Sequence, residues 1–476
     1  MLDKKELSKV LTRALRRGGD FAEIYVEEKQ ISNVLCEDNR IEKINSGREK
    51  GAGIRVLKEG RTAYVYTNEL SPSGLERAAD LAAQVLGSNN NTEHETINLT
   101  PRQSGCQLKY LRMPDRVAFD EKITRVLAAN QAAREMDAEI RQVTVALADV
   151  HRKLQIANSE GDLTEEEQVR VRMVVNAIAA RDGMIQTGYE SAGGALGWEL
   201  LDQVPIEDLA RDAAGRAVAM LSAVPAPLGK MPVVMHAEAG GTMIHEACGH
   251  GLEADLVQKG LSVYKDKLGE QVAIEKLSVI DDATIKGKYG SFAYDDEGTP
   301  AQRTVMIDRG ILKQFINDRL TAGYDGSALT GNGRRESYQH KPIPRMTNTF
   351  IAPGEDDPEK IIAGTEYGLL VKKMGGGQVN TINGDFVFDV QEGYIIENGE
   401  IKHPVRGATL TGNGPQALLD IDRIGKDLGY ALGVCGKEGQ GVPVADAQPT
   451  IRIKALTVGG IGSDDTPKTV KRIRRM

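Results

Sequence analysis

Two histidines and a glutamate lie close together in one short segment of this chain. His245 is followed directly by Glu246, and His250 comes five residues after His245, in the run GGTMIHEACGHGLEADL. The whole chain of 476 residues contains only seven histidines, so this pairing is a marked concentration. Imidazoles bind Zn²⁺, and a carboxylate beside the ion can take a proton from an attacking water. The segment therefore indicates a hydrolytic zinc site.

The spacing of the two histidines is one residue longer than in the H-E-x-x-H pattern, whose ligands share one face of a helix. On a regular α-helix, His245 and His250 would point about 140° apart. One π-type turn would bring them back together, and Gly249 and Gly251 would accommodate such a distortion. We therefore expect a helix through His245 that is distorted or ends near His250. In an undistorted helix, one histidine would be buried, the other exposed, and no ion shared.

A catalytic zinc site usually takes three protein ligands, so a third must come from elsewhere in the chain. Cys248 lies between the histidines, but its side chain would point to a different face of the helix. Cys435 lies in the glycine-rich run LGVCGKEGQGVPVADAQPT, where Gly433 and Gly436 would let a thiolate approach an ion closely. A small buried cysteine without a ligand role is the alternative interpretation. The residues alone leave both interpretations of Cys435 open.

Several blocks of the sequence resemble the TldD/PmbA metallopeptidases, a family formerly described as modulators of DNA gyrase. The blocks are GAGIRVLKEGRTAYVYTNEL, HEACGHGLEADL, PRMTNTFIAPGE, GGGQVNTINGDFVFDVQEGYIIENGE, GATLTGNGPQALLDID and VCGKEGQGVPVADAQPTIRIKALTVGG. The chain resembles the catalytic TldD branch because it keeps the H-E-x-x-x-H motif, which the PmbA (TldE) branch has lost. The resemblance implies Zn²⁺ ligands at His245, His250 and Cys435 and a general base at Glu246. Cys248 falls where the family needs no cysteine.

The resemblance implies a zinc-dependent peptidase that hydrolyses unfolded or leader-type peptides with an activated water. It also implies a partner, a PmbA/TldE-type paralogue in a heterodimer, with a homodimer as the alternative. Arg345, Thr347 and Asn348 of PRMTNT are candidates for lining the peptide path, although a turn that satisfies its own backbone explains them almost as well. The rival functions are a non-catalytic modulator of gyrase or of a toxin–antitoxin component, and a hydrolase of small amides.

Composition describes a globular protein with at least two domains. The chain is 40% hydrophobic and 27% charged, which is ordinary for a globular protein, and too long for one core. A net charge of −8 and an aromatic content of 4% argue against a nucleic-acid surface. The basic C-terminal residues, among them Lys468 and Arg475, are interpreted as a charged strand edge. Dispersed cysteines, and the lack of a signal-like or membrane-spanning apolar run, predict a cytoplasmic location.

The pattern of apolar residues predicts an α+β fold. Residues 1–225 are expected to form an N-terminal α/β domain with mixed or antiparallel sheets and packed helices. Asp3 should cap its first helix, and further helices are expected over residues 74–85, 119–136 and 205–223. The order of helix, strands and helix occurs twice, which suggests an internal duplication. The polar stretch 88–104 has no periodicity and is expected to be a loop.

Residues 226–476 are expected to form a C-terminal, β-rich, barrel-like domain that carries the metal-site helix. The domain should begin with the strand MPVVMH, after the proline-rich run PAPLGK. Hairpin turns are expected at Asp308-Arg309-Gly310 and at Glu397-Asn398-Gly399. The run Gly375-Gly376-Gly377 lacks the lysine of a phosphate loop, and is better explained by a bulge or a close approach of substrate.

Overall fold

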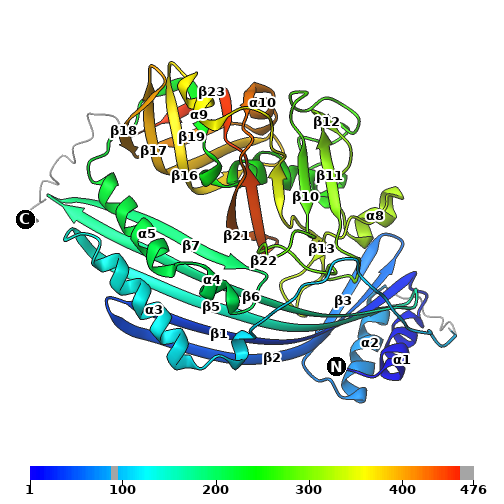
Figure 1. The fold of residues 1–476 in the computed structure, drawn as a ribbon. Coiled ribbons are helices and arrows are strands. Elements are labelled where there is room, and N and C mark those ends of the chain that lie inside the picture. The colour runs from blue at the N-terminus through cyan, green and yellow to red at the C-terminus, as the bar shows by residue number, and fades with distance from the viewer. Residues whose placement is uncertain (87–94, 461–476) are drawn as a thin grey trace, which may run out of the picture.

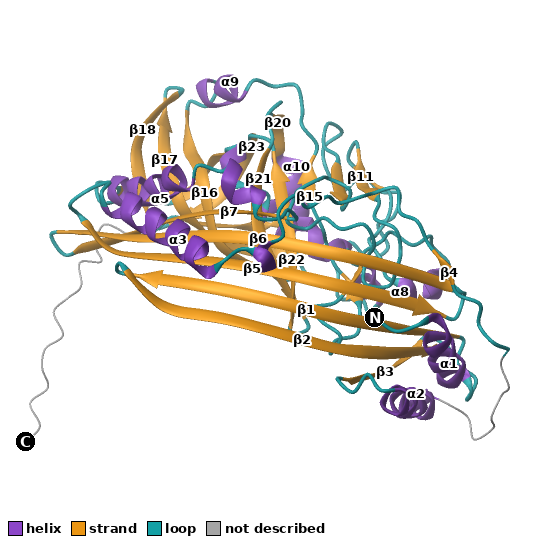
Figure 2. Ribbon diagram, turned by 60° about the horizontal axis from the view of Figure 1, so that its bottom comes forward, coloured by secondary structure: helices purple, strands orange, loops and turns teal. Residues whose placement is uncertain are grey.

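The computed structural model describes residues 1–86 and 95–460 of the chain. Figures 1 and 2 show a long, curved sheet with helices in the N-terminal half, and a second β-rich part packed against that sheet. Helices and strands are mixed throughout, as expected for an α+β fold. No helix within the described ranges is long and apolar enough to span a membrane. The basic C-terminal residues and part of the predicted polar loop lie outside the described residues.

The N-terminal half is built on a seven-stranded sheet in which β7 pairs with β6 beside the order β3–β2–β1–β5–β6–β4. Its strands are β1 (Phe21–Glu37), β2 (Arg40–Lys58), β3 (Arg61–Thr67), β4 (Thr100–Pro101), β5 (Ile140–Asn158), β6 (Asp162–Arg181) and β7 (Met184–Gly194). The β4–β6 pair is parallel and the other pairs are antiparallel. A turn at Asp38 and Asn39, both with positive φ, connects β1 to β2.

Helices pack on this sheet close to where the sequence predicts them. They are α1 (Lys4–Leu15), α2 (Pro72–Leu86), α3 (Phe119–Arg134), α4 (Glu199–Gln203) and α5 (Ile206–Met220), with a short 3₁₀ turn η1 (Pro114–Arg116). The side chain of Asp3 accepts a hydrogen bond from the Glu6 N–H, which confirms the predicted cap of α1. The order of helix, three strands and helix occurs twice along the chain.

Alternate residues of β1 face two different layers of the molecule. Ile24 packs with α1 and α2, and Val34 packs with α3 and α5, so these side chains face the helices. Tyr25 lies in a separate cluster with Tyr338 of the C-terminal part. Since successive side chains of a strand point to opposite faces, the helices and the C-terminal part cover opposite faces of the sheet.

A buried ionic network joins the sheet to the C-terminal part. A guanidinium nitrogen of Arg335 lies 2.5 Å from a carboxylate oxygen of Glu23, and Arg55 pairs with Glu297. None of these four side chains is more than 1% exposed. Buried charges are tolerated only when they are paired, and removing one partner leaves the other uncompensated. The network therefore holds the C-terminal part in one position on the sheet.

A closed five-stranded barrel forms one side of the C-terminal part. The ring consists of β16 (Tyr367–Val379), β9 (Gly229–Met235), β23 (Ile451–Gly459), β19 (Thr409–Asn413) and β17 (Asp385–Glu397), which pairs back to β16. The strands β8 (Val224–Pro225), β18 (Glu400–Arg406) and β20 (Ile421–Ile424) extend it. Asn398 and Gly399, both with positive φ, connect β17 to β18. The predicted barrel and this predicted hairpin are confirmed.

A six-stranded sheet lies beside the barrel, in the order β12–β11–β10–β15–β22–β21. Its strands are β10 (Val279–Asp282), β11 (Arg303–Asp308), β12 (Ile311–Leu312), β15 (Thr349–Ile351), β21 (Gly429–Lys437) and β22 (Gln440–Gln448). The hairpin predicted at residues 308–310 joins β11 to β12. A two-stranded ribbon of β13 (Gly333–Arg334) and β14 (Ile343–Pro344) lies apart. β21 is the last strand of the larger sheet.

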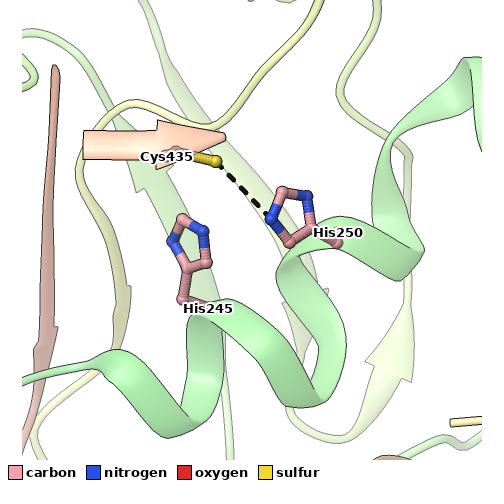
Figure 3. A group of neighbouring side chains, drawn as sticks. All are labelled: His245, His250 and Cys435. Atoms are coloured by element: carbon pink, nitrogen blue, oxygen red, sulfur yellow. Dashed lines mark hydrogen bonds between the residues drawn. The ribbon is translucent and has the colours of Figure 1, made fainter. Parts of the chain in front are cut away.

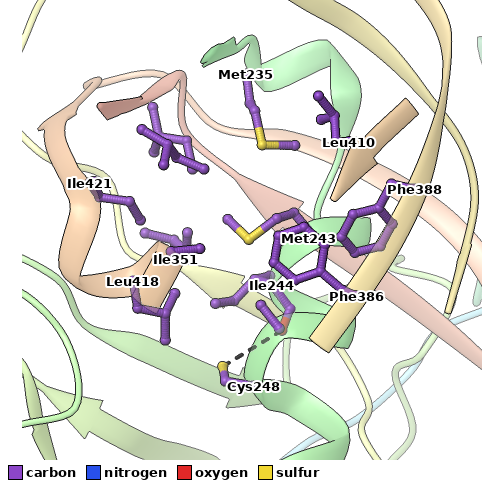
Figure 4. Packing of buried hydrophobic residues seen from close by; sticks show 14 of the residues in the cluster. Met235, Met243, Ile244, Cys248, Ile351, Phe386, Phe388, Leu410, Leu418 and Ile421 are labelled. Atoms are coloured by element: carbon purple, nitrogen blue, oxygen red, sulfur yellow. Dashed lines mark hydrogen bonds between the residues drawn. The ribbon is translucent and has the colours of Figure 1, made fainter. Parts of the chain in front are cut away.

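Short helical segments complete the C-terminal part. They are η2 (Ala237–Ala239), α6 (Thr242–Ile244), η3 (His245–Gly249), η4 (His250–Leu252), α7 (Ala254–Gln258), α8 (Arg319–Asp325), α9 (Pro358–Ala363) and α10 (Gly414–Asp420). Met243, Ile244 and Cys248 pack against Phe388 of the barrel and Ile351 of the sheet (Figure 4). The segment that carries the two histidines is therefore anchored in the core by its inner face.

We propose residues 1–225 and 226–476 as the two domains. The strands β1 to β7 all belong to the long sheet, whereas the strands from β9 onward belong to the barrel or to the sheets beside it. β8 consists of the last two residues of the first range and pairs with β18 beside the barrel. The chain passes from the long sheet to the barrel side between the end of β7 at Gly194 and the start of β8 at Val224.

Candidate metal centre

The backbone between the two histidines forms a single π-helical turn. η3 is a π-helix over His245–Gly249, and the N–H of His250 donates to the carbonyl of His245. The last residue of the turn is closely packed, since a Cβ on Gly249 would lie 2.2 Å from the sulfur of Met346. The wider turn brings residues five apart to one side of the helix. The distortion predicted near His250 is confirmed.

The two imidazoles and the thiol of Cys435 converge in space. One donor atom from each of the three residues lies within 4.8 Å of the others. The sulfur of Cys435 lies 3.5 Å from Nε2 of His250, and the two imidazole rings are 4.8 Å apart between centroids. Figure 3 shows Cys435 approaching from a strand on the side of the rings away from the helix. The structure brings together the three residues that the sequence suggested as ligands.

Strand pairing and hydrogen bonds fix the backbone of Cys435. It lies in β21, which pairs with β22 in an antiparallel hairpin closed by Glu438 and Gly439. The guanidinium of Arg345 donates to the carbonyls of Cys435 and Gln440, and its side chain is fully buried. The arginine therefore fixes the hairpin at the point where the thiol reaches the histidines.

A carboxylate lies behind each imidazole. Nδ1 of His245 is 3.0 Å from Oδ1 of Asp446, and Nδ1 of His250 is 3.0 Å from Oε2 of Glu253. The same oxygen of Glu253 lies 3.0 Å from the ammonium of Lys437. Carboxylates that hold the far nitrogen of a histidine fix the ring orientation and its tautomer, as is usual at metal sites. In each ring, Nε2 is then the nitrogen that would bind a metal ion.

The charges of the site strongly affect one another. Burial alone would lower the pKa of His250, but Glu253 and Cys435 outweigh it and raise that pKa to about 9. His245 behaves in the same way beside Asp446, and its pKa lies well above the ordinary value. Burial would raise the pKa of the Cys435 thiol, but the imidazoles outweigh burial and hold that pKa well below its usual range. Without a metal ion, the protonated imidazoles balance the charge of the Cys435 thiolate. A bound metal cation would take the place of those protons.

Glu246 lies on the open side of the same helical segment. Residues 243–245 and 247–249 are buried, whereas Glu246 is partly exposed. Burial nevertheless raises the pKa of its carboxyl group, and no hydrogen bond to the described residues engages it. The carboxylate is therefore beside the converging donors and uncommitted.

The residues suggested for the peptide path are enclosed in the fold. Arg345, Thr347 and Asn348 are all fully buried. Thr347 donates through its N–H and its hydroxyl to Asp281, and the amide of Asn348 donates to the carbonyl of Asp282. In this structure they hold their own chain together around the site. Contact with substrate stays a prediction for all three.

Cys248 is separate from the metal centre. Its thiol points into the core at 3.6 Å from the carbonyl of Ile244 (Figure 4), and burial raises the pKa of this thiol. This agrees with the prediction that it faces another side of the helix.

Sequence reasoning missed Asp446, Glu253 and Lys437. Glu253 follows His250 by three residues, a spacing that places side chains together on a helix. Asp446 and Lys437 lie in the same glycine-rich segment as Cys435. A search for carboxylates three or four residues from each candidate ligand would have found Glu253, whereas Asp446 comes close to His245 only through the pairing of β22 with β21.

The donor set fits zinc. Two imidazole nitrogens and one thiolate sulfur, with carboxylates behind the rings, are the ligand types that Zn²⁺ prefers, and three protein ligands leave a position for water. A sulfur ligand argues against magnesium and calcium, which take oxygen.

Comparison with known proteins gives a consistent result. Models of the PmbA/TldA metallopeptidase family match in three segments: domain 1 over residues 22–86, the central domain over 112–221 and the C-terminal domain over 228–460. A metalloprotease TldD homolog from Haemophilus influenzae is 34% identical, with 93% of this chain and 94% of that protein covered. A metalloprotease from Methanocaldococcus jannaschii is 37% identical, with 95% and 99% covered.

Solved structures share the fold. A Thermotoga maritima protein described as a candidate modulator of a DNA gyrase aligns with a TM-score of 0.77 at 25% identity, over 92% of this chain and 96% of that one. TldE from Thermococcus kodakarensis aligns with a TM-score of 0.75 at 19% identity, over 96% and 100%. Since the family matches extend over nearly the whole sequence and include the segments that form the centre, the chain belongs to the TldD/PmbA metallopeptidase family.

Proposed function

We propose that this protein is a zinc-dependent peptidase of the TldD type that hydrolyses unfolded or leader-type peptides. The observation that carries the proposal is the convergence of His245, His250 and Cys435 beside the uncommitted carboxylate of Glu246. The relatives named as metalloproteases support the same class of reaction.

In this proposal His245, His250 and Cys435 hold the ion. When bound, zinc would polarise the scissile carbonyl and make a water acidic enough to attack near neutral pH. Glu246 accepts a proton from that water at its carboxylate and returns it to the leaving amine. Asp446 and Glu253 keep the two imidazoles oriented, and Arg345 keeps the Cys435 backbone in place.

An extended peptide suits the surroundings of the site. β21, which carries Cys435, is the last strand of its sheet, so one side of its backbone has no strand partner among the described residues. Main-chain pairing with an edge strand binds peptides with little dependence on sequence. This supports unfolded chains as substrates.

We also propose that the protein is cytoplasmic and assembles with a PmbA/TldE-type paralogue, or with a second copy of itself. The fold shared with TldE supports a partnership between similar subunits. Size-exclusion chromatography of the purified chain, alone and mixed with such a paralogue, distinguishes the two assemblies.

The second candidate is a non-catalytic modulator of DNA gyrase. Its basis is the description of the Thermotoga maritima protein. Direct tests of gyrase supercoiling with and without the protein separate this role from peptide hydrolysis.

The test of the proposed function combines metal analysis with peptide cleavage. We expect about one zinc ion per chain and hydrolysis of an unstructured peptide, with Glu246→Gln reducing kcat by at least about a hundredfold while retaining zinc. Glu275→Gln, at an exposed glutamate outside the site, serves as the control and should behave as the wild type. Unchanged cleavage by Glu246→Gln would show that another group is the base.

A further inference from the structure

A cavity of about 790 Å³ lies between the long sheet and the barrel. It is lined by β6 and β7 on one side, by β16 and β17 on the other, and by residues 430–432 of β21. Thr242, at the start of α6, contributes to its wall. The cavity therefore lies where the long sheet, the barrel and the strand that carries Cys435 meet.

The cavity begins close to the metal centre. Thr242 and Glu246 are both partly exposed, whereas the three residues between them are buried. Four residues of helix correspond to about 6 Å along the axis. Leu432, in the opposite wall, comes three residues before Cys435 in the same strand, which corresponds to about 10 Å. A peptide positioned for attack would place a neighbouring residue at the mouth of the cavity.

The charges lining the cavity leave one carboxylate unbalanced. The ammonium of Lys373 lies 2.9 Å from both carboxylate oxygens of Glu190, and Arg216 lies 2.7 Å from one of them and also pairs with Glu392. Asp389 also lines the cavity and is exposed. Its carboxylate has no hydrogen bond or ion pair with any residue in the described ranges. A cationic group that enters the cavity would therefore find Asp389 available.

The triple-glycine run of β16 keeps space beside Asp389. The pairing of β16 with β17 slips between Met374 and Gly377, so the bulge predicted from the sequence is confirmed. A Cβ on Gly376 would meet nothing within 4 Å, and a Cβ on Gly375 would lie 3.0 Å from the Cβ of Asp389. Larger residues at these positions would occupy the space in front of the carboxylate.

We propose that this cavity is a subsite for a substrate side chain next to the scissile bond, and that Asp389 makes it prefer lysine or arginine. The inference rests on the peptidase function proposed above. It predicts a preference at one position of the peptide, on top of main-chain binding that depends little on sequence.

A binding experiment tests the subsite without requiring catalysis. The Glu246→Gln protein, purified with its metal, is titrated with fluorescent alanine hexapeptides that carry one lysine, or one glutamate, at each position in turn. At one position the lysine peptide should bind about fivefold more tightly than the glutamate peptide, the size expected for one exposed ion pair. Adding Asp389→Asn should bring this ratio close to one.

Glu397→Gln is the matched control, because it removes one negative charge from the exposed far end of β17 and should leave the ratio unchanged. If no position distinguishes lysine from glutamate, or if Asp389→Asn leaves the ratio unchanged, the inference is wrong. Hydrolysis of the same peptides by protein with Glu246 intact separates the two proposals. Cleavage without any lysine preference would overturn the subsite alone. Selective binding with no cleavage would overturn the peptidase and leave the subsite.

Discussion

Oδ1 of Asp446 lies 3.0 Å from Nδ1 of His245, although the two residues belong to different elements, β22 and η3. The carboxylate therefore lies beside one nitrogen of the ring, and its strand pairs directly with β21, which carries Cys435. One hairpin therefore supplies both a proposed ligand and the group that orients another ligand.

Asp446→Asn should weaken zinc binding by about 10- to 100-fold, because the charged partner that orients His245 is lost while all three donors remain. Competition with a fluorescent chelator measures the affinity. Asp422→Asn, which removes a carboxylate paired with the distant Arg452, is the control. Equal affinities of the two variants would show that the Asp446 contact plays no part in holding the ion.

Arg345→Met should also weaken zinc binding, by about tenfold, since the carbonyl of Cys435 loses its guanidinium donor. The variant also buries carbonyls without a partner and should unfold at a lower temperature. Arg334→Met is the matched control, because Arg334 is equally buried and donates to the carbonyls of Met346 and Pro443. We expect similar losses of stability from the two variants but a larger loss of zinc affinity from Arg345→Met; equal zinc affinities would contradict the proposed role of Arg345.

Gly433→Val should reduce kcat/KM for peptides by at least about tenfold with zinc retained. Gly433 lies on the same face of β21 as Cys435, and its added Cβ would meet only Val444, at 3.6 Å. The valine would therefore occupy open space beside the centre, where a misplaced substrate reacts slowly. Gly436→Val, on the opposite face and with no atom within 4 Å of its added Cβ, should leave cleavage intact. Comparable activity in both variants would show that peptide does not pass Gly433.

Glu166 should make the stability of the fold depend on pH. Burial raises the pKa of its carboxyl group from 4.5 to about 7, although the N–H groups of Ala293 and Tyr294 donate to it. The folded protein therefore keeps a proton that the unfolded chain releases, so this contribution is complete below about pH 4.5 and is lost as pH rises through 7.

Glu166→Gln should consequently flatten the fall in stability between pH 4.5 and 7, as measured by urea unfolding at a series of pH values. Asp212→Asn, at an exposed position of α5, should leave the slope of the wild type unchanged. If Glu166→Gln unfolds with the same pH slope as the wild type, the carboxyl group has the same affinity for protons in both states.

The sequence predicted those features that depend on residues close together in the chain. The cap at Asp3 and the turn at Asn398 and Gly399 follow from the conformational preferences of those residues, and the π turn follows from the spacing of His245 and His250. The barrel could be expected from many short strands separated by turns.

Contacts between distant segments could not be predicted in the same way. The pairing of Glu23 with Arg335 depends on how the sheet and the C-terminal part dock, which no periodicity reports. Asp446 reaches His245 only because β22 pairs with β21. For the same reason the sequence left Cys435 open between ligand and buried thiol, whereas the structure places its sulfur beside both rings.

X-ray absorption at the zinc edge of the metal-loaded protein tests whether His245, His250 and Cys435 hold the ion. We predict two nitrogen ligands and one sulfur ligand at about 2.3 Å, with the sulfur contribution lost in Cys435→Ser and retained in Cys248→Ser. A spectrum of the native protein without sulfur, or one that Cys435→Ser leaves unchanged, would contradict it.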